Sequence, residues 1–215
     1  MLSYDGLGMS NGTRTTLNGY AEEISNELRK SEIGSHLLVE YPDLLTLREM
    51  YSHYTKSALD EGTEVVVILP FYETVDSVRR VLSEDPTCID VRKYEKEERL
   101  LIIDSLKGYF GSVKGLMPFV KQAVEHAKSS GRCGLTVIGD MGSFFYYDKE
   151  GDLVGWEMNL PRKFEINLKG FCLYHTRDVK RLSEEDKREL FQHHIKTVHL
   201  LPSTLVDTAE SSYVL

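Results

Sequence analysis

The chain has 215 residues, of which 41% are hydrophobic and 28% are charged, which is typical of a globular protein and argues against wholesale disorder. Its formal net charge of −8 argues against general nucleic-acid binding and against docking on anionic lipid, because both need a basic surface. No apolar run approaches the roughly 20 residues of a membrane span, and residues 1–16 lack the apolar core of a signal peptide, so we expect a cytoplasmic protein.

The three cysteines, Cys88, Cys133 and Cys172, are widely spaced and form no CxxC pair. Each lies beside or within an apolar run, as in CIDV, CGLTVIG and FCLYH. We therefore expect buried, reduced thiols in strands, with a zinc site or a nucleophile as the alternative.

The N-terminal region, residues 1–34, is expected to form a polar tail and one short amphipathic helix. Leu17, Ala21, Ile24 and Leu28 recur at helical spacing, with charged residues elsewhere on the helical wheel. This helix is expected to lie on the domain or on a partner. It is too short and too isolated to be a DNA-reading helix-turn-helix.

Residues 35–202 are expected to form one α/β domain, followed by a polar tail at residues 203–215. Apolar runs alternate there with amphipathic helical patterns. The apolar runs predict about seven strands, at residues 35–41, 64–70, 88–91, 99–105, 133–140, 170–175 and 196–201. Helices are predicted between them, near residues 43–61, 74–84, 115–129, 152–167 and 183–195. This alternation predicts a three-layer α/β fold with a mainly parallel central sheet and helices on both faces.

Two of the predicted strands end in an acidic residue. Asp104 follows LLII and Asp140 follows LTVIG. The pattern resembles the Walker B aspartate, which orients magnesium beside nucleotide phosphates. A capping or turn-forming aspartate explains it equally well.

The first strand–helix junction lacks the features of a phosphate-binding loop. It reads EYPDLLTLREM from Glu40, without glycine and without lysine. A phosphate loop needs successive backbone N–H groups that face the anion and a Lys-Ser/Thr pair at the helix start. Pro42 removes one such donor, and Glu40 and Asp43 repel phosphate. We therefore predict a degenerate phosphate loop that does not bind ATP in the usual manner.

Two further groups of residues have a structural and a functional interpretation. The aromatic residues 144–147 adjoin Asp140 and precede Trp156, and they form either a packed loop or a ligand cage. His193 and His194 are adjacent on a predicted helix and point about 100° apart, so they are poor joint ligands. We interpret the pair as surface residues or as one packed ring.

The order of these segments resembles one known family, the MEDS domain (methanogen/methylotroph, DcmR sensory domain). The segments that carry the resemblance are HLLVEY, GTEVVVILP, LLIIDSLKGYFG, GRCGLTVIGDMGSFF, LVGWEMNLP and GFCLYH. It covers about residues 35–201. The resemblance implies a RecA/KaiC-like fold that has lost the phosphate loop, and a sensory module for small molecules, in some members hydrocarbon derivatives. Members are often fused to DNA-binding or histidine-kinase parts, which this sequence lacks.

From the residues and the resemblance together, we expect a non-enzymatic sensory domain with a ligand pocket at the carboxyl edge of the sheet. Six positions match recurrent residues of the family, namely Tyr41, Asp104, Tyr109, Asp140, Met141 and Glu157. With three aromatic residues added, the predicted ligand-binding set is Tyr41, Phe71, Asp104, Tyr109, Asp140, Met141, Phe144, Trp156 and Glu157. No catalytic residue, metal or cofactor is expected. The expected partners are a small-molecule ligand and a second copy or signalling protein, with neither nucleic acid nor membrane.

Two alternative functions remain open from the sequence. The first is a magnesium-dependent nucleotide-binding protein or ATPase relative that uses Asp104 and Asp140. The second is an assembly module without a ligand, in which the helix at residues 17–30 docks on a neighbour.

Overall fold

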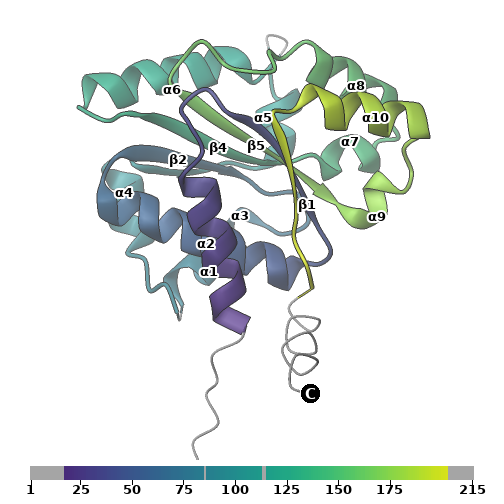
Figure 1. Cartoon of the computed structure of the whole chain (residues 1–215). Coiled ribbons are helices and arrows are strands. Elements are labelled where there is room, and N and C mark those ends of the chain that lie inside the picture. The colour runs from purple at the N-terminus through teal and green to yellow at the C-terminus, as the bar shows by residue number, and fades with distance from the viewer. Residues whose placement is uncertain (1–16, 85, 113–114, 203–215) are drawn as a thin grey trace, which may run out of the picture.

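Six strands pair in parallel in one sheet at the centre of the computed structural model, which describes residues 17–84, 86–112 and 115–202 (Figure 1). The strands are β1 (His36–Tyr41), β2 (Glu64–Leu69), β3 (Leu100–Ile102), β4 (Gly134–Asp140), β5 (Leu168–His175) and β6 (Lys196–His199). Their order across the sheet is β3-β2-β4-β5-β1-β6, and every pairing is parallel. The three-layer parallel α/β fold is therefore confirmed. The prediction of seven strands is wrong by one within the described residues.

Helices cover both faces of this sheet, as Figure 1 shows. The helices are α1 (Leu17–Arg29), α2 (Leu44–Glu61), α3 (Val75–Ser83), α4 (Val91–Lys96), α5 (Ser105–Phe110), α6 (Met117–Ser129), α7 (Gly142–Tyr146), α8 (Glu150–Met158), α9 (Thr176–Val179) and α10 (Glu184–His193). Side chains from α1 to α4 share one hydrophobic core. Side chains from α5 to α10 share the other.

The alternation of side chains along each strand supplies both cores. Val65 and Val67 of β2 pack in one core, whereas Val66 and Ile68 pack in the other. Because successive side chains of a strand point to opposite faces, a sheet that is covered on both faces needs continuous apolar runs. The β-branched run of β2 therefore predicted its position between two layers of helices.

Capping groups fix the helix ends that the sequence indicated. The Asp43 carboxylate accepts a hydrogen bond from the Thr46 backbone N–H at 2.9 Å, which starts α2. Gly62 ends α2 with a φ of 69°, a left-handed conformation that glycine adopts without strain. Ser183 caps α10 by accepting from the Asp186 N–H.

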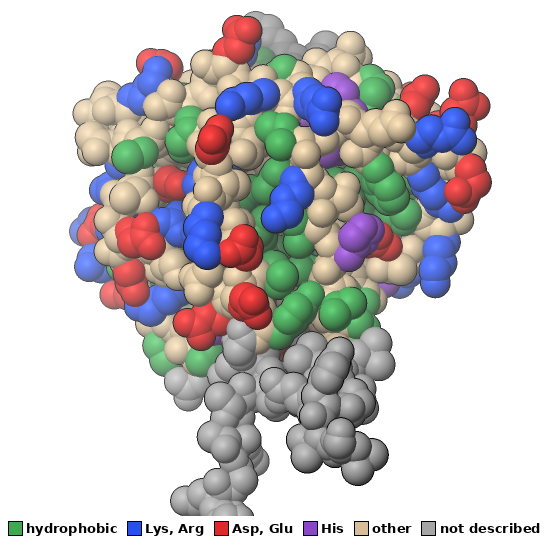
Figure 2. Space-filling model, viewed as in Figure 1, with side chains coloured by type: hydrophobic (Ala, Val, Ile, Leu, Met, Phe, Trp, Pro, Cys, Tyr) green, Lys and Arg blue, Asp and Glu red, His purple; other side chains and the backbone are tan. Residues whose placement is uncertain are grey.

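A groove of about 820 Å³ runs between α1 and the edge strand β6. Figure 2 shows this face, where hydrophobic side chains lie between charged ones. Ile24, Leu28 and Val198 supply part of its apolar wall, and Lys30 and Lys196 are among its charged residues. None of the predicted ligand-binding residues lines this groove.

The predicted strand at residues 88–91 is wrong. Cys88 has a φ of 46°, and Asp90 caps α4 by accepting a hydrogen bond from the Lys93 N–H at 3.1 Å. The segment is therefore a turn that leads into a helix. Its Ile89 and Val91 are buried in the core on the α1–α4 face of the sheet, and neither belongs to a strand.

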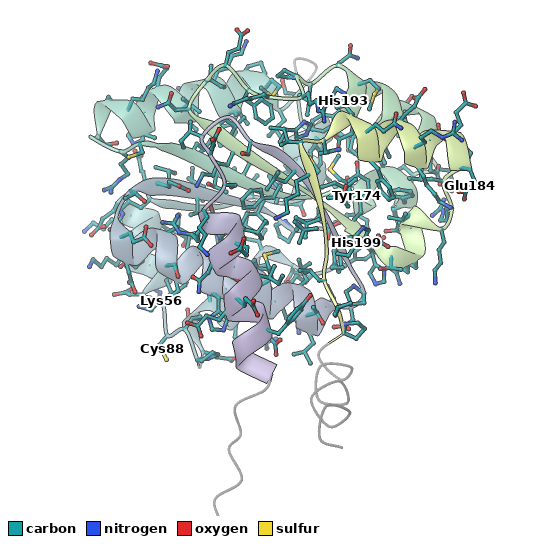
Figure 3. All side chains as sticks on the ribbon, viewed as in Figure 1. Lys56, Cys88, Tyr174, Glu184, His193 and His199 are labelled. Carbon is teal, nitrogen blue, oxygen red and sulfur yellow. The ribbon has the colours of Figure 1, made fainter. Side chains whose placement is uncertain are left out.

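The expectation of three buried thiols is also wrong for two of them. Cys88 and Cys133 are exposed, and only Cys172 is buried. Figure 3 shows Cys88 at the edge of the molecule, away from Tyr174 on β5. Each exposed thiol lies just before a buried apolar segment, Cys88 before Ile89 and Cys133 before β4. The apolar residues that follow each cysteine therefore suggested that the thiol itself is buried.

Several predicted loops and helices differ from the structure in extent. No helix is predicted between the strand at residues 99–105 and the helix near residues 115–129, but the structure has the short helix α5 there. The aromatic segment after Asp140 contains the short helix α7. The helix predicted near residues 152–167 is α8, which ends at Met158, three residues before Pro161.

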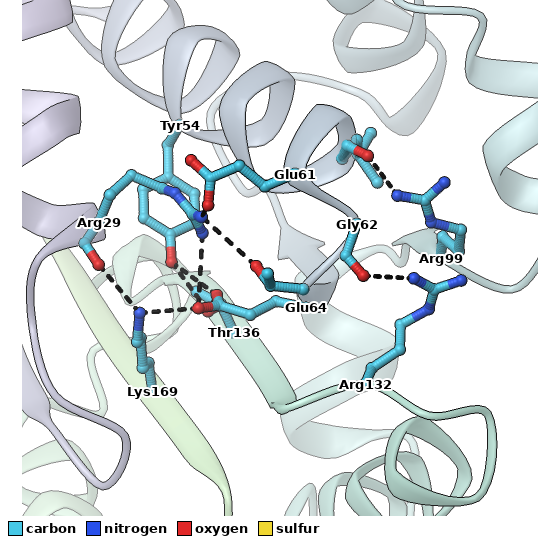
Figure 4. A network of polar contacts seen from close by, with 11 residues as sticks. Arg29, Tyr54, Glu61, Gly62, Glu64, Arg99, Arg132, Thr136 and Lys169 are labelled. Atoms are coloured by element: carbon cyan, nitrogen blue, oxygen red, sulfur yellow. Dashed lines mark hydrogen bonds and ion pairs between the residues drawn. The ribbon is translucent and has the colours of Figure 1, made fainter.

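A buried network of charged residues fixes the end of α1 against the sheet (Figure 4). Arg29 forms ion pairs with Glu61 and with Glu64, the first residue of β2. Lys169 Nζ donates to Glu64 Oε1 at 2.8 Å and to the Arg29 carbonyl at 3.2 Å. Tyr54 and Thr136 donate to the other Glu64 oxygen. The N-terminal helix therefore lies on its own domain, against α2.

None of the helices in the described part of the chain is long and apolar enough to cross a membrane. The predicted tails at residues 1–16 and 203–215 lie outside the described residues.

Candidate functional site

The turn between β1 and α2 is two residues long. Tyr41 ends β1 and Leu44 begins α2, so only Pro42 and Asp43 connect them. The Asp43 side chain already binds the Thr46 N–H at the helix start. The Tyr41 carbonyl accepts a hydrogen bond from Thr176 Oγ1 at 3.2 Å, which ties the turn to the end of β5. The N-terminus of this helix thus carries a carboxylate where an anion would bind.

Asp140 lies buried at the end of β4, with a hydrogen-bond donor on each carboxylate oxygen. The Tyr41 hydroxyl donates to Oδ2 at 2.8 Å, and the Gly142 N–H donates to Oδ1 at 2.8 Å. Burial raises the pKa of Asp140 to about 7, although both hydrogen bonds act in the opposite direction. The following Met141 is fully buried in the core. Asp140 therefore links the end of β1, through Tyr41, to the start of α7, through Gly142.

Other side chains fill the rest of the carboxyl edge beside Asp140. Tyr72 donates to the Asp178 carboxylate, and Phe71 packs edge-on against Tyr72. The hollow left at this edge, which Asp140 and Tyr72 line, has a volume of about 10 Å³. A space of that size holds at most one water molecule.

Asp104 does not meet Asp140 in the structure. Strand β2 lies between β3 and β4, so the two strands that precede these aspartates are not neighbours. Asp104 caps α5 by accepting a hydrogen bond from the Lys107 N–H at 3.2 Å. It therefore has the capping role that the sequence left open.

Three of the predicted aromatic residues cluster on the face of the sheet that α5 to α10 cover. The Tyr109 ring lies 5.4 Å from Trp156 and 5.5 Å from Phe144, measured between centroids. Phe144 and Trp156 are 6.0 Å apart. A Cβ at Gly139 would overlap the Tyr109 hydroxyl, so the glycine of the GD pair provides the space for this ring.

A small cavity of about 30 Å³ lies between this cluster and the sheet. Helices α5, α6 and α8 supply lining residues on one side of the cavity, and strands β4 and β5 of the sheet supply lining residues on the other. Apart from His36, Tyr109 and Cys172, the lining residues are apolar or glycine. The lining residues are His36, Tyr109, Leu116, Met117, Val120, Val137, Gly139, Trp156, Leu160, Phe164, Leu168, Gly170, Phe171 and Cys172.

Glu157 points into the protein beside this cavity. The residues that it contacts lie far apart in the sequence, and no sequence pattern predicted their contact. It is fully buried, and its Oε1 accepts a hydrogen bond from the Tyr174 hydroxyl at 2.6 Å. Its Oε2 lies 3.3 Å from His36 Nε2 and 3.7 Å from His194 Nε2. Burial lowers the pKa of His194 to about 4, so this ring is neutral at pH 7. Burial also raises the pKa of the Cys172 thiol, which lies in the same cluster.

The predicted ligand-binding residues thus occupy separate places. Tyr109, Phe144 and Trp156 lie together on one face. Tyr41, Phe71 and Asp140 lie at the carboxyl edge. Asp104 caps α5, Met141 lies in the core next to Asp140, and Glu157 is a buried carboxylate beside the cavity.

His36 and Cys172 were not among the predicted site residues, although both line the cavity. The signal that could have found them is strand alternation. His36 precedes Leu38 by two positions, and Cys172 precedes Tyr174 by two, so each pair shares a face of the sheet. The interpretation of His193 and His194 as one packed ring is confirmed, since His194 is buried.

The fold and this arrangement define a three-layer parallel α/β domain with a small, mostly apolar cavity on one face of its sheet. The family model of the MEthanogen/methylotroph, DcmR Sensory domain (MEDS) matches residues 35–195. The chain therefore belongs to the MEDS family, whose name describes a sensory domain. No curated protein matches the sequence.

Proposed function

We propose that this protein is a sensory module that binds a small, largely apolar molecule in the cavity beside Tyr109 and Trp156. The observation that carries the proposal is the cavity itself, because its lining is apolar and aromatic with few polar groups. Ligand pockets in proteins combine an apolar wall with a small number of polar groups that orient the ligand. The hydroxyl of Tyr109 and the side chains of His36 and Cys172 are the polar groups here.

The size of the cavity points to the class of ligand. A volume of about 30 Å³ is room for roughly two water molecules. A neutral compound of one to three carbon atoms therefore fits after small shifts of the surrounding side chains. This agrees with the hydrocarbon derivatives that the family resemblance implied.

The cavity wall also offers a route for a signal. Trp156 is half-buried and belongs to α8, and α8 packs against α10 on the outer layer. A ligand that pushes Trp156 outward shifts α8 relative to the sheet. A partner protein or a second copy of the chain would detect that shift at the surface.

The nucleotide-binding alternative has less support. A phosphate at the end of β1 would meet Asp43, with the buried Asp140 and Asp178 nearby, and the turn offers too few N–H groups to surround it. The parallel sheet and the aspartate that ends β4 support the RecA/KaiC-like relationship that the resemblance implied. The glycine-free turn supports the loss of the phosphate loop.

A thermal-shift screen of neutral compounds with one to three carbon atoms tests the proposal. Alcohols, ketones and alkyl halides are added to the full chain and to two variants. Val120→Ile adds one methyl group to a residue that lines the cavity. Val124→Ile makes the same change one helical turn further along α6, at an equally buried residue that does not line the cavity.

We expect at least one compound class to raise the melting temperature of the parent and of Val124→Ile, but not that of Val120→Ile. A flat screen with all three proteins contradicts the proposal. Calorimetric titration with Mg-ATP provides the opposite test, since micromolar affinity that is lost in Asp140→Asn would favour the nucleotide-binding function instead.

A further inference from the structure

Four potential metal ligands converge in the interior from four different elements. His36 begins β1, Glu157 lies on α8, Cys172 lies on β5 and His194 follows α10. One donor atom from each lies within 4.8 Å of the other three. All four residues are buried, with exposed fractions of 0%, 0%, 7% and 2% respectively.

Four of the six separations between these donor atoms are near those of a tetrahedral metal site, and the other two are at most 4.8 Å. His36 Nε2 lies 3.3 Å from both Cys172 Sγ and Glu157 Oε2. Glu157 Oε2 lies 3.8 Å from Cys172 Sγ and 3.7 Å from His194 Nε2. Ligands in a tetrahedron around zinc, at metal distances of about 2.0–2.3 Å, lie about 3.3–3.6 Å apart. The cluster therefore needs only small movements to close around an ion.

The second ring nitrogen of each histidine is already bound to a backbone carbonyl. His36 Nδ1 lies 3.2 Å from the Pro161 oxygen, and His194 Nδ1 lies 2.7 Å from the Leu190 oxygen. Since a carbonyl only accepts, each Nδ1 carries a proton, and in the neutral form of the ring the Nε2 atom presents a lone pair to the cluster. This outer hydrogen bond is the arrangement found around histidines that bind metals.

With both rings in that form, the cluster holds more acceptors than donors. Tyr174 already donates to Glu157 Oε1, so Oε2 faces the cluster as an acceptor beside the two Nε2 atoms. The thiol of Cys172 can donate only one proton to these three acceptors. His194 Nε2 is buried without any hydrogen-bond partner. Buried polar atoms of native proteins rarely lack partners, so a cation at the centre would resolve the deficit.

We propose that His36, Glu157, Cys172 and His194 bind one divalent transition-metal ion, and that zinc is the ion that this set fits best. Two neutral imidazoles, one carboxylate and one thiolate carry a total charge of −2, which a divalent ion balances. Binding forms two metal–nitrogen bonds, one metal–oxygen bond and one metal–sulfur bond, and the Cys172 thiol proton leaves to solvent. Mixed nitrogen, sulfur and oxygen ligands in a tetrahedron are typical of zinc.

A site with four protein ligands and no exposed ligand has a structural role. The ion would join the ends of α10 and α8 to β1 and β5, which are neighbours in the sheet. This inference goes beyond the sensory function and does not depend on it: the metal would take His36 Nε2 and Cys172 Sγ, and the Tyr109 hydroxyl would remain as the polar group of the cavity. Metal content is its readout, whereas ligand-induced stabilisation is the readout for the cavity.

Metal content and cobalt spectroscopy of the untagged full chain test the inference. The protein is produced with added zinc, and in parallel with added cobalt, and is then desalted in the presence of a weak chelator. We expect about one metal ion per chain. We also expect the cobalt form to show a thiolate-to-metal charge-transfer band and the strong visible bands of a tetrahedral site.

Two ligand variants and two matched controls assign the site. Cys172→Ser should abolish the charge-transfer band, and His194→Gln should weaken zinc binding by at least about 10-fold to 100-fold, as measured by competition with a chelator. Cys133→Ser and His126→Gln change an exposed thiol and an exposed histidine, and both should behave as the parent.

Two outcomes overturn the inference. The first is a folded parent protein that holds no zinc or cobalt after desalting. In that case a proton shared by His36 and Glu157 would supply the missing hydrogen-bond donor of the cluster. The second is metal binding that persists unchanged in Cys172→Ser and His194→Gln. Should those variants fail to fold, the cobalt spectrum of the parent still decides, because it reports directly whether a thiolate binds the metal.

Discussion

At the carboxyl edge of the sheet, the fold raises the pKa of the Asp140 carboxyl group. Its side chain is buried, and its pKa is about 7 instead of the ordinary 3.8. Between these two values the folded protein holds a proton that the unfolded chain has already released. Stability from this group is therefore fully present below pH 4 and is lost as the pH rises to 7.

The variant Asp140→Asn should remove this pH dependence. Relative to the variant, the free energy of unfolding of the parent should fall between pH 4 and pH 7, by at most about 1.4 kcal/mol per pH unit. Urea denaturation at pH 4, 5, 6, 7 and 8 measures it. Tyr41→Phe keeps the carboxyl and loses one donor to it, so the decline should persist and extend to higher pH. Parallel profiles of parent and Asp140→Asn would contradict this account.

Gly139 and Gly155 offer a matched pair of glycine substitutions. A Cβ at Gly139 would overlap the Tyr109 hydroxyl, whereas nothing lies within 4 Å of a Cβ at Gly155 on the exposed side of α8. Gly139→Ala should therefore lower the free energy of unfolding by about 1–3 kcal/mol. Gly155→Ala should raise it by about 0.5–1 kcal/mol, since alanine favours the helix. Urea denaturation distinguishes the two signs, and a stable Gly139→Ala protein would mean that Tyr109 does not occupy this place.

At the scale of elements, the attachment of α1 depends on one buried carboxylate. Glu64 neutralises both Arg29 and Lys169, and the side chains of all three are at most 10% exposed. Removing one partner from a buried ion pair leaves an uncompensated charge and costs about 3–5 kcal/mol.

Glu64→Gln should therefore destabilise the protein by roughly 3 kcal/mol and loosen α1 before the rest of the fold. Hydrogen exchange should show the amides of residues 20–29 losing protection ahead of those in β2 and β4. Glu61→Gln is the matched control, because Glu61 also pairs with Arg29 but is 55% exposed. It should cost less than about 1 kcal/mol. Equal effects of the two substitutions would mean that the buried network does not fix the helix.

The sequence predicted elements well where one local signal was strong. The β-branched run of β2 appears in the structure as predicted, and caps at Asp43, Gly62 and Ser183 stand at the ends of the helices predicted near residues 43–61 and 183–195. The wrong strand lies where apolar residues outside the strands pack into a core against the sheet. Ile89 and Val91 suggested a strand, but they belong to a turn and to the start of α4. Residue hydropathy alone cannot distinguish these two environments.

The candidate site was less predictable than the elements, for a physical reason. The sequence placed Asp104 and Asp140 at the carboxyl edge of the sheet, because each follows a predicted strand. It could not predict that β2 lies between β3 and β4, because the order of strands depends on the whole fold. Glu157, His36, Cys172 and His194 lie as far as 158 positions apart in the sequence (His36 to His194) and meet only through packing of α8 and α10 on the sheet. No spacing rule connects residues that far apart.

At the scale of the whole molecule, each of the two faces of the sheet has its own buried core. The face with α1 to α4 is closed by side-chain hydrogen bonds at the carboxyl edge and by the Glu64 network at the other end. The face with α5 to α10 contains the small cavity and the four-residue cluster. The proposed sensory function places ligand recognition on this second face, under helices that reach the surface.

Residue-resolved nuclear magnetic resonance of the ¹⁵N-labelled full chain, titrated with the best compound of the screen, tests the central claim most directly. The account predicts saturable, one-to-one shifts of the Trp156 indole N–H and of the Tyr109, Val120 and Gly139 amides. It predicts that Val120→Ile abolishes these shifts and that Val124→Ile preserves them. Saturable shifts confined to Asp140, Tyr41 and Tyr72 would instead locate the ligand at the carboxyl edge and contradict the cavity as the sensing site.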